Sequence, residues 1–96
     1  MAVYKIAHIR ERGQDMIIVP LDSQFHYRTA QEKESFRLAL GRCAANAGLK
    51  GTVCLVWTYG SRLYSISPPP WHPFFKTVSM AFIARNINKN LTCDFG

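Results

Sequence analysis

Two stretches of this chain follow the same order of features, and this internal resemblance constrains the fold more than any other pattern. Each stretch runs from an apolar segment through a Gly turn to a second apolar segment with a nearby proline, and then through an aromatic–His pair into a helix-like segment. The stretches are residues 9–49 and 53–91, with turns at Gly13 and Gly60, prolines at Pro20 and Pro68, and the pairs Phe25-His26 and Trp71-His72. Such a repeat predicts two hairpin–helix units, neither of which buries its apolar face alone.

The first unit is predicted to begin with a β-hairpin. Residues 2–10 place Val, Tyr and Ile among polar residues, and residues 16–21 form a second run rich in β-branched side chains. Gly13 tolerates the positive φ of a tight turn between the two strands. Pro20 cannot donate a ladder hydrogen bond and is therefore expected at a strand end or on an edge.

The helix of the first unit has signals at both ends. Thr29 and Glu32 have the spacing of a capping box, in which each residue bonds the backbone of the other. Gly48 is expected just beyond the C-terminal end, and Gly41 inside the helix is expected to allow close packing on a sheet. The apolar positions fall on one stripe, formed by Phe36, Leu40, Cys43, Ala44 and Ala47.

The second unit is predicted to begin with strands at residues 52–58 and 62–67. With Gly60-Ser61 as a two-residue loop, Trp57 lies opposite Tyr64 and Leu55 lies opposite Ile66. These side chains share one face, which is expected to lie in the core.

A second helix is predicted after the stiff connector formed by residues 68–70, which are all proline. His72-Pro73 is a suitable start because Pro is favoured in the first helical turn. One apolar stripe is formed by Met80, Ile83, Ala84, Ile87 and Leu91, and residues 92–96 are expected to fray.

These elements predict an α+β fold in the order ββαββα, in one domain that spans residues 1–96. Unit one is residues 1–49 and unit two is residues 50–96, related by a pseudo-twofold repeat of a hairpin–helix unit. The expected architecture is a four-stranded antiparallel sheet with both helices packed on one face.

Composition limits the environment of the chain. The longest apolar stretches, residues 16–21 and 53–57, are too short for a membrane-spanning helix. The first residues lack the basic start and apolar core of a signal peptide, so a cytoplasmic location is expected. The three cysteines, Cys43, Cys54 and Cys93, are an odd number without CxxC spacing, which favours reduced thiols.

The balance of charge favours an anionic partner. The chain has 12 Lys and Arg against 6 Asp and Glu, a formal net charge of +6. Such a field attracts nucleic acid or an acidic protein surface.

If the two hairpin turns project from one end of the sheet, basic and stackable side chains gather there, while the second predicted helix ends in basic residues and side-chain amides. The candidate nucleic-acid-binding residues are Arg10, Arg12, Tyr59, Arg62, Lys76, Arg85, Asn86 and Lys89. Alternatively, these bases are solvated, and those at the helix end only complement its dipole.

A second group of apolar residues in helix 2 suggests a protein interface and a homo-oligomer. If both helices cover one face of the sheet, little surface remains to bury these side chains. The candidate interface residues are Trp71, Phe74, Phe75, Val78 and Phe82. Alternatively, Trp71 and Phe74 fold back over the end of the core.

The residues offer little support for catalysis, metal or cofactor binding. No His or Cys has a second ligand at zinc spacing, and no pair of acids requires general acid–base work. His26 and His72 can converge on a phosphate, or each can stabilise the corner before its helix, and the second interpretation is favoured. The predicted function is therefore a non-enzymatic binding or regulatory domain that contacts nucleic acid or another polyanion through unit two. A protein-interaction or inhibitory module is the alternative.

Overall fold

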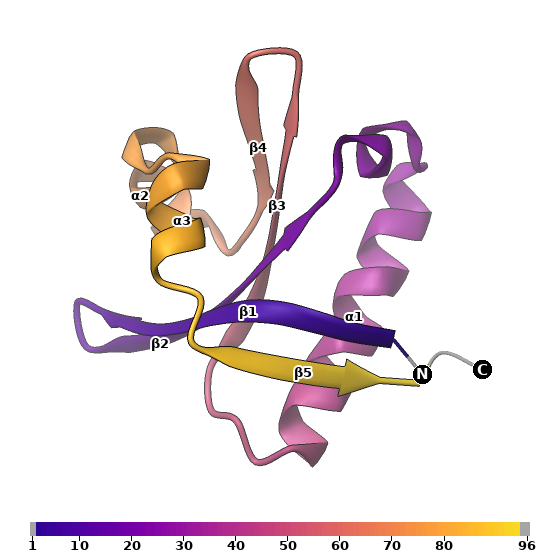
Figure 1. Cartoon of the computed structure of the whole chain (residues 1–96), viewed down its shortest axis with the longest axis vertical. Helices are drawn as coiled ribbons and strands as arrows, with labels where there is room; N and C mark the ends of the chain where they lie inside the picture. The colour runs from indigo at the N-terminus through magenta and orange to yellow at the C-terminus, as the bar shows by residue number, and fades with distance from the viewer. Residues whose placement is uncertain (1, 95–96) are drawn as a thin grey trace.

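The computed structural model describes residues 2–94 and shows an α+β fold around one five-stranded sheet (Figure 1). The strands are β1 (Ala2–Glu11), β2 (Gln14–Leu21), β3 (Thr52–Tyr59), β4 (Arg62–Ile66) and β5 (Lys89–Cys93). The helical elements are η1 (Ser23–Tyr27), α1 (Ala30–Asn46), η2 (Pro69–Trp71), α2 (His72–Thr77) and α3 (Met80–Arg85). The strand order is β4-β3-β2-β1-β5.

Both predicted hairpins are present. β1 and β2 pair antiparallel around a turn in which Arg12 and Gly13 have positive φ angles of 52° and 76°. In the second hairpin, Trp57 pairs with Tyr64 and Leu55 pairs with Ile66, which confirms the predicted register. Local turn chemistry is sufficient to set this register because a two-residue loop fixes which residues face each other.

The prediction of an all-antiparallel, four-stranded sheet is wrong at the junction of the two units. β2 and β3 are parallel, from the pair Met16–Thr52 to the pair Leu21–Trp57. The reason is α1, whose 17 residues carry the chain from the end of β2 back to the end where β2 began. A connection of this length allows the next strand to run in the same direction as the first.

The predicted second helix is also wrong in its extent. The chain forms two short helices, α2 and α3, and then a fifth strand, β5. Val78 is extended between the helices, and the hydroxyl of Ser79 accepts a hydrogen bond from the Phe82 amide at the start of α3. The apolar stripe predicted through Leu91 therefore ends early, because Leu91 lies in β5.

The helices cover opposite faces of the sheet, which corrects the prediction that both lie on one face (Figure 1). Alternate residues of the central strands face different layers. Ile17, Val19 and Leu55 pack in the core beneath α1, while Ile18 and Val56 pack beneath α2 and α3. Both faces are therefore buried, and the short apolar runs of β2 and β3 have the pattern of strands covered on two sides.

The first helix matches its sequence signals. The Thr29 hydroxyl accepts from the Glu32 amide at 3.0 Å, and the Glu32 carboxylate accepts from the Thr29 amide at 2.9 Å. These hydrogen bonds lower the pKa of Glu32. Leu40 and Ala44 are buried on the predicted stripe, and Gly48 has a φ of 78° just past the helix end.

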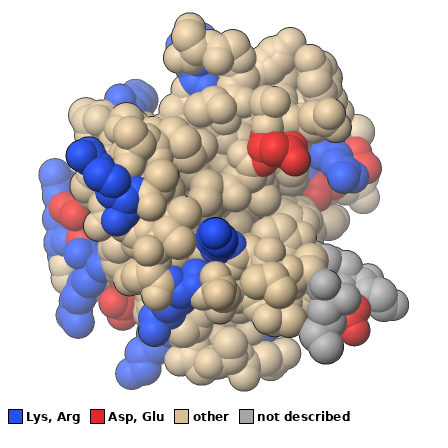
Figure 2. All heavy atoms as spheres, viewed as in Figure 1, with Lys and Arg blue, Asp and Glu red and all other residues tan. Residues whose placement is uncertain are grey.

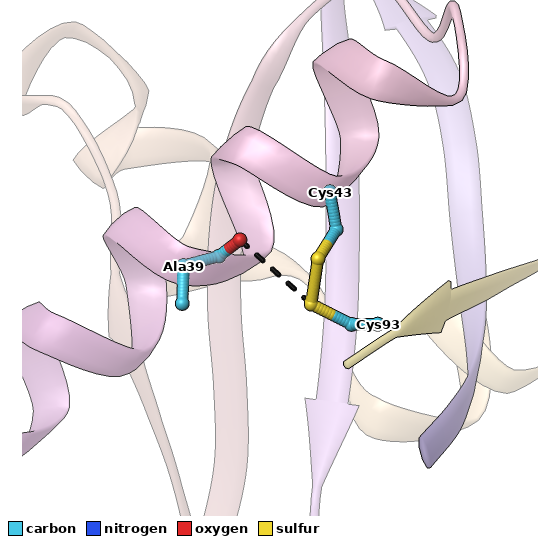
Figure 3. The surroundings of a disulfide bond; sticks show 3 residues. All are labelled: Ala39, Cys43 and Cys93. Carbon is cyan, nitrogen blue, oxygen red and sulfur yellow. Dashed lines mark hydrogen bonds between the residues drawn. A yellow bond between two sulfur atoms is a disulfide. The ribbon is translucent and has the colours of Figure 1, made fainter. Parts of the chain in front are cut away.

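A disulfide joins Cys43 on α1 to Cys93 on β5, with 5.5 Å between the Cα atoms (Figure 3). The Cys93 sulfur also lies 3.8 Å from the Ala39 carbonyl oxygen. The prediction that all three thiols are reduced is therefore wrong, and Cys54 is the free, buried cysteine. The predicted frayed tail is wrong for residues 92 and 93, which are paired in β5, while residues 95 and 96 lie outside the described part of the chain.

Candidate anion-binding site

A pocket of about 450 Å³ lies between β4 and α2. β4 contributes its first two residues and Ser65, and α2 with the residue after it contributes the opposite wall. Phe75 is only 5% exposed and packs in the core beneath the helix, so the pocket stands on a fixed support. The lining residues are Arg62, Leu63, Ser65, His72, Phe75, Lys76 and Val78.

Two basic side chains of the pocket come from one face of α2. His72 and Lys76 are four residues apart in the helix and therefore lie one turn from each other. The Nε2 atom of His72 lies 3.0 Å from the carbonyl oxygen of Ser67, and because the carbonyl can only accept, Nε2 is the donor. This hydrogen bond anchors the start of α2 to the chain that follows β4.

The ionisable residues that line this pocket are all basic. Arg62, His72 and Lys76 line it, and no acidic residue does. Among residues 2–94, the ion pairs join Arg28 to Glu32 and Arg37 to Glu34, so no carboxylate neutralises Arg62 or Lys76. The positive charge of both pocket side chains is available to a ligand.

Of the residues predicted at the two hairpin turns, Arg62 lines this pocket and the others do not. Arg10 and Arg12 lie at the β1–β2 turn, while Tyr59 and Arg62 lie at the β3–β4 turn. Because β2 and β3 run parallel, these turns are at opposite ends of the sheet, and the expected cluster of both turns does not form (Figure 1). In the view of Figure 2, basic side chains are spread over several parts of the surface, with acidic side chains between some of them.

The predicted residues near the end of the chain have separate positions. Arg85 is exposed in the last turn of α3, and Lys89 is exposed in β5. The side-chain amide of Asn86 donates to the Phe82 carbonyl at 2.8 Å and thus helps to end α3. Asn88 bonds both backbone groups of His8 and extends the contact between β5 and β1.

The predicted interface residues cover the second face of the sheet. Phe75 is buried, and Trp71, Phe74, Val78 and Phe82 are partly buried against the same core. The Phe74 ring contacts the rings of Phe75 and Phe82, with centroid distances of 5.1 Å and 6.3 Å. The expectation that these side chains had no surface to cover followed from placing both helices on one face.

The two histidines of the repeated aromatic–His pairs have different surroundings. His26 packs on Tyr59 and accepts a hydrogen bond from the Trp57 indole nitrogen on the α1 side of the sheet. His72 lines the pocket on the α2 side. They therefore do not converge on one anion, and His72 alone accompanies the basic side chains.

Sequence reasoning missed Tyr27, an exposed residue whose hydroxyl lies 3.3 Å from the hydroxyl of Tyr59. No periodic pattern marks it, because it lies in the short helix η1 rather than in a strand. Within residues 2–94, no three His, Cys, Asp or Glu side chains gather as ligands for a metal ion. The same residues contain no helix that is long and apolar enough to cross a membrane.

Comparison of the chain with protein-family models, with curated proteins and with solved structures gives no match.

Proposed function

We propose that this protein is a small binding domain for polyanions, with nucleic acid as its ligand, and that the pocket between β4 and α2 is the centre of its binding surface. One observation carries the proposal: Arg62, His72 and Lys76 line a single pocket that has no acidic residue in its lining. The net charge of +6 supports it, since a positive field raises the rate at which an anionic ligand is encountered.

The chemistry of these side chains suits phosphate. The planar guanidinium of Arg62 can donate two parallel hydrogen bonds to phosphate oxygens, while the Lys76 ammonium acts as a compact positive charge. Leu63 and Phe75 add apolar surface to the lining of the pocket. These contacts bind the backbone of a nucleic acid and do not by themselves select a sequence.

An interface through the aromatic residues of α2 has less support. Phe75 is in the core, and its neighbours cover the sheet. A contact with an acidic protein surface would use the same basic pocket, so it is an outcome of the test below.

The test compares the affinity of the protein for labelled DNA and RNA, measured by fluorescence anisotropy at several salt concentrations. Arg62→Gln and Lys76→Gln remove a pocket charge, while Arg42→Gln removes an exposed charge on α1 as the matched control. Each pocket substitution removes a hydrogen bond from a charged group, which contributes about 1.5–3 kcal/mol. The affinity of each pocket variant should therefore be about tenfold to a hundredfold lower than that of the wild type. The logarithm of the affinity falls with the logarithm of the salt concentration. The size of this slope should decrease by about 1 for each phosphate that the variant no longer neutralises.

Two results would refute the proposal. One is the absence of binding by the wild-type protein at low salt. The other is an equal loss of affinity in Arg42→Gln and in the two pocket variants, because this would show that only the total charge matters. Binding to an acidic polypeptide but not to nucleic acid would show that the ligand of the pocket is a protein.

A further inference from the structure

A group of aromatic rings lies on the α1 side of the β3–β4 hairpin. The His26 ring packs against two other rings of this group, with centroid distances of 3.9 Å to Tyr59 and 4.8 Å to Tyr64. Tyr27 contacts Tyr59 at 5.5 Å, and Trp57 stacks on Tyr64 with only 11° between the ring planes. We call these residues the aromatic cluster: His26, Tyr27, Trp57, Tyr59 and Tyr64.

The aromatic cluster extends from the core to solvent. Trp57 is 4% exposed and belongs to the core beneath α1, so it serves as the base of the cluster. Tyr27 is 74% exposed, although its hydroxyl is held near the Tyr59 hydroxyl. The cluster thus presents a ring to solvent on a support of other rings, which reduces the entropy that Tyr27 would lose when a ligand packs on it.

The aromatic cluster and the basic pocket lie on opposite faces of the β3–β4 hairpin and approach each other at Tyr59 and Arg62, near its tip. Tyr59 and Arg62 are directly opposite each other in the β3–β4 ladder, and Arg62 also lines the pocket. Figure 1 shows that the tip projects beyond the rest of the sheet, with α2 on one side and η1 on the other. A flexible chain that crosses the tip can therefore contact the pocket and the aromatic cluster together.

We propose that the ligand is a single-stranded nucleic acid with a base that stacks on Tyr27 while its phosphates bind the pocket. This inference rests on the proposed function and specifies its ligand. Proteins that bind single strands combine a basic surface with exposed aromatic rings, because every unpaired base offers a face for stacking. In a duplex those faces are covered by neighbouring bases, so the exposed ring of Tyr27 would add nothing to binding.

The experiment compares three labelled ligands of equal phosphate number: an oligothymidylate of about 16 nucleotides, the same strand with abasic sites, and a duplex of the same charge. Affinities are measured for the wild type, Tyr27→Ala and Tyr27→Phe. Leu38→Ala, which shortens an exposed apolar side chain on α1, is the matched control. Thermal unfolding of each variant establishes that it is folded.

We expect Tyr27→Ala to bind the oligothymidylate about fivefold to a hundredfold more weakly, which is the range measured for loss of one stacked base. Tyr27→Phe keeps the ring and should keep most of the affinity, and Leu38→Ala should match the wild type. The abasic strand should bind weakly and should not distinguish the Tyr27 variants. An oligothymidylate that carries photoreactive 5-iodouracil should cross-link to Tyr27 or Tyr59, which tests the contact without a substitution.

The possible failures are distinguishable. In one case, Arg62→Gln lowers the affinity for all three ligands, Tyr27→Ala lowers none of the affinities, and the cross-links lie at other residues. This result overturns the stacking inference and leaves the polyanion function standing. Equal affinity of the wild-type protein for the intact and the abasic strand would likewise overturn the stacking inference and leave the polyanion function standing. If the wild type binds none of the ligands at low salt, both proposals are overturned.

Discussion

Trp57 donates a hydrogen bond from its indole Nε1 to Nδ1 of His26, at 3.3 Å, and thereby ties β3 to the short helix η1. The indole is almost fully buried, and its nitrogen is a donor that needs a partner. His26 can accept this bond only while Nδ1 carries no proton. The contact therefore fixes both the position of η1 and the tautomer of the imidazole.

Removal of this acceptor should destabilise the protein. His26→Phe keeps a ring against Tyr59 but leaves the buried Trp57 donor without its partner, and we expect a loss of about 1–3 kcal/mol in the free energy of unfolding. Urea denaturation provides the measurement. Tyr27→Phe, which removes an exposed hydroxyl, should change stability by less than about 0.5 kcal/mol. Equal stability of His26→Phe and the wild type would show that water replaces the imidazole.

The disulfide should contribute substantially to stability. It closes a loop between residues 50 positions apart, and chain-entropy arguments give about 4 kcal/mol for a loop of this size, near the upper end of the usual range. We expect a reducing agent to lower the denaturation midpoint of the wild type. The same agent should have no effect on the double variant Cys43→Ala/Cys93→Ala. Three titratable thiols in unfolded protein that was never exposed to reductant would contradict the disulfide.

The remaining cysteine should be unreactive in the folded protein. Burial raises the pKa of Cys54 to about 12, so at pH 8 only about one molecule in ten thousand carries the thiolate. Alkylation by iodoacetamide at pH 8 should be slow in buffer and fast in denaturant. Because the unfolded thiol ionises first, the unfolded state binds fewer protons above about pH 9, and stability should fall as pH rises further. Rapid alkylation under native conditions would show that the chain around Cys54 opens.

Two glycines should respond oppositely to substitution by alanine. Gly51 has a φ of 128°, and a Cβ there would lie 2.7 Å from the Asp15 carbonyl oxygen, so Gly51→Ala should destabilise the protein by at least about 1 kcal/mol. Gly41 lies within α1 with open space around its Cβ position. Gly41→Ala should therefore stabilise the protein by about 0.5–1 kcal/mol. Thermal unfolding of both variants tests these predictions. A change in stability of the same sign in both variants would contradict the backbone conformations at Gly41 and Gly51.

The features predicted correctly from the sequence are those that neighbouring residues determine. The capping box at Thr29 and the register around Gly60 need only a few residues each, and the structure has both. The close packing expected at Gly41 is wrong, because its Cβ position faces open space. Helix periodicity was misleading near Leu91, since a strand residue that packs against the core can fall by chance on a helical stripe.

The features that were missed depend on residues distant in sequence. The parallel pairing of β2 with β3 depends on the path of α1, and the disulfide depends on β5 reaching that helix. Cysteine number alone suggested the wrong redox state. For the candidate site, Arg62 and Lys76 were among the predicted residues, but only the structure shows that they share a pocket with His72. Tyr27 gave no signal because exposure cannot be inferred from one aromatic residue in a connector.

The pairing of β5 with the first half of β1 has a practical meaning for protein engineering. Ala2 lies opposite Cys93, so the two ends of the described chain emerge together, on the far side of the sheet from the β3–β4 hairpin (Figure 1). Neighbouring ends favour circular permutation, with a short linker between them. In addition, a sensor chip or an affinity resin can be attached at either end without touching the hairpin tip, which lies elsewhere on the molecule (Figure 1).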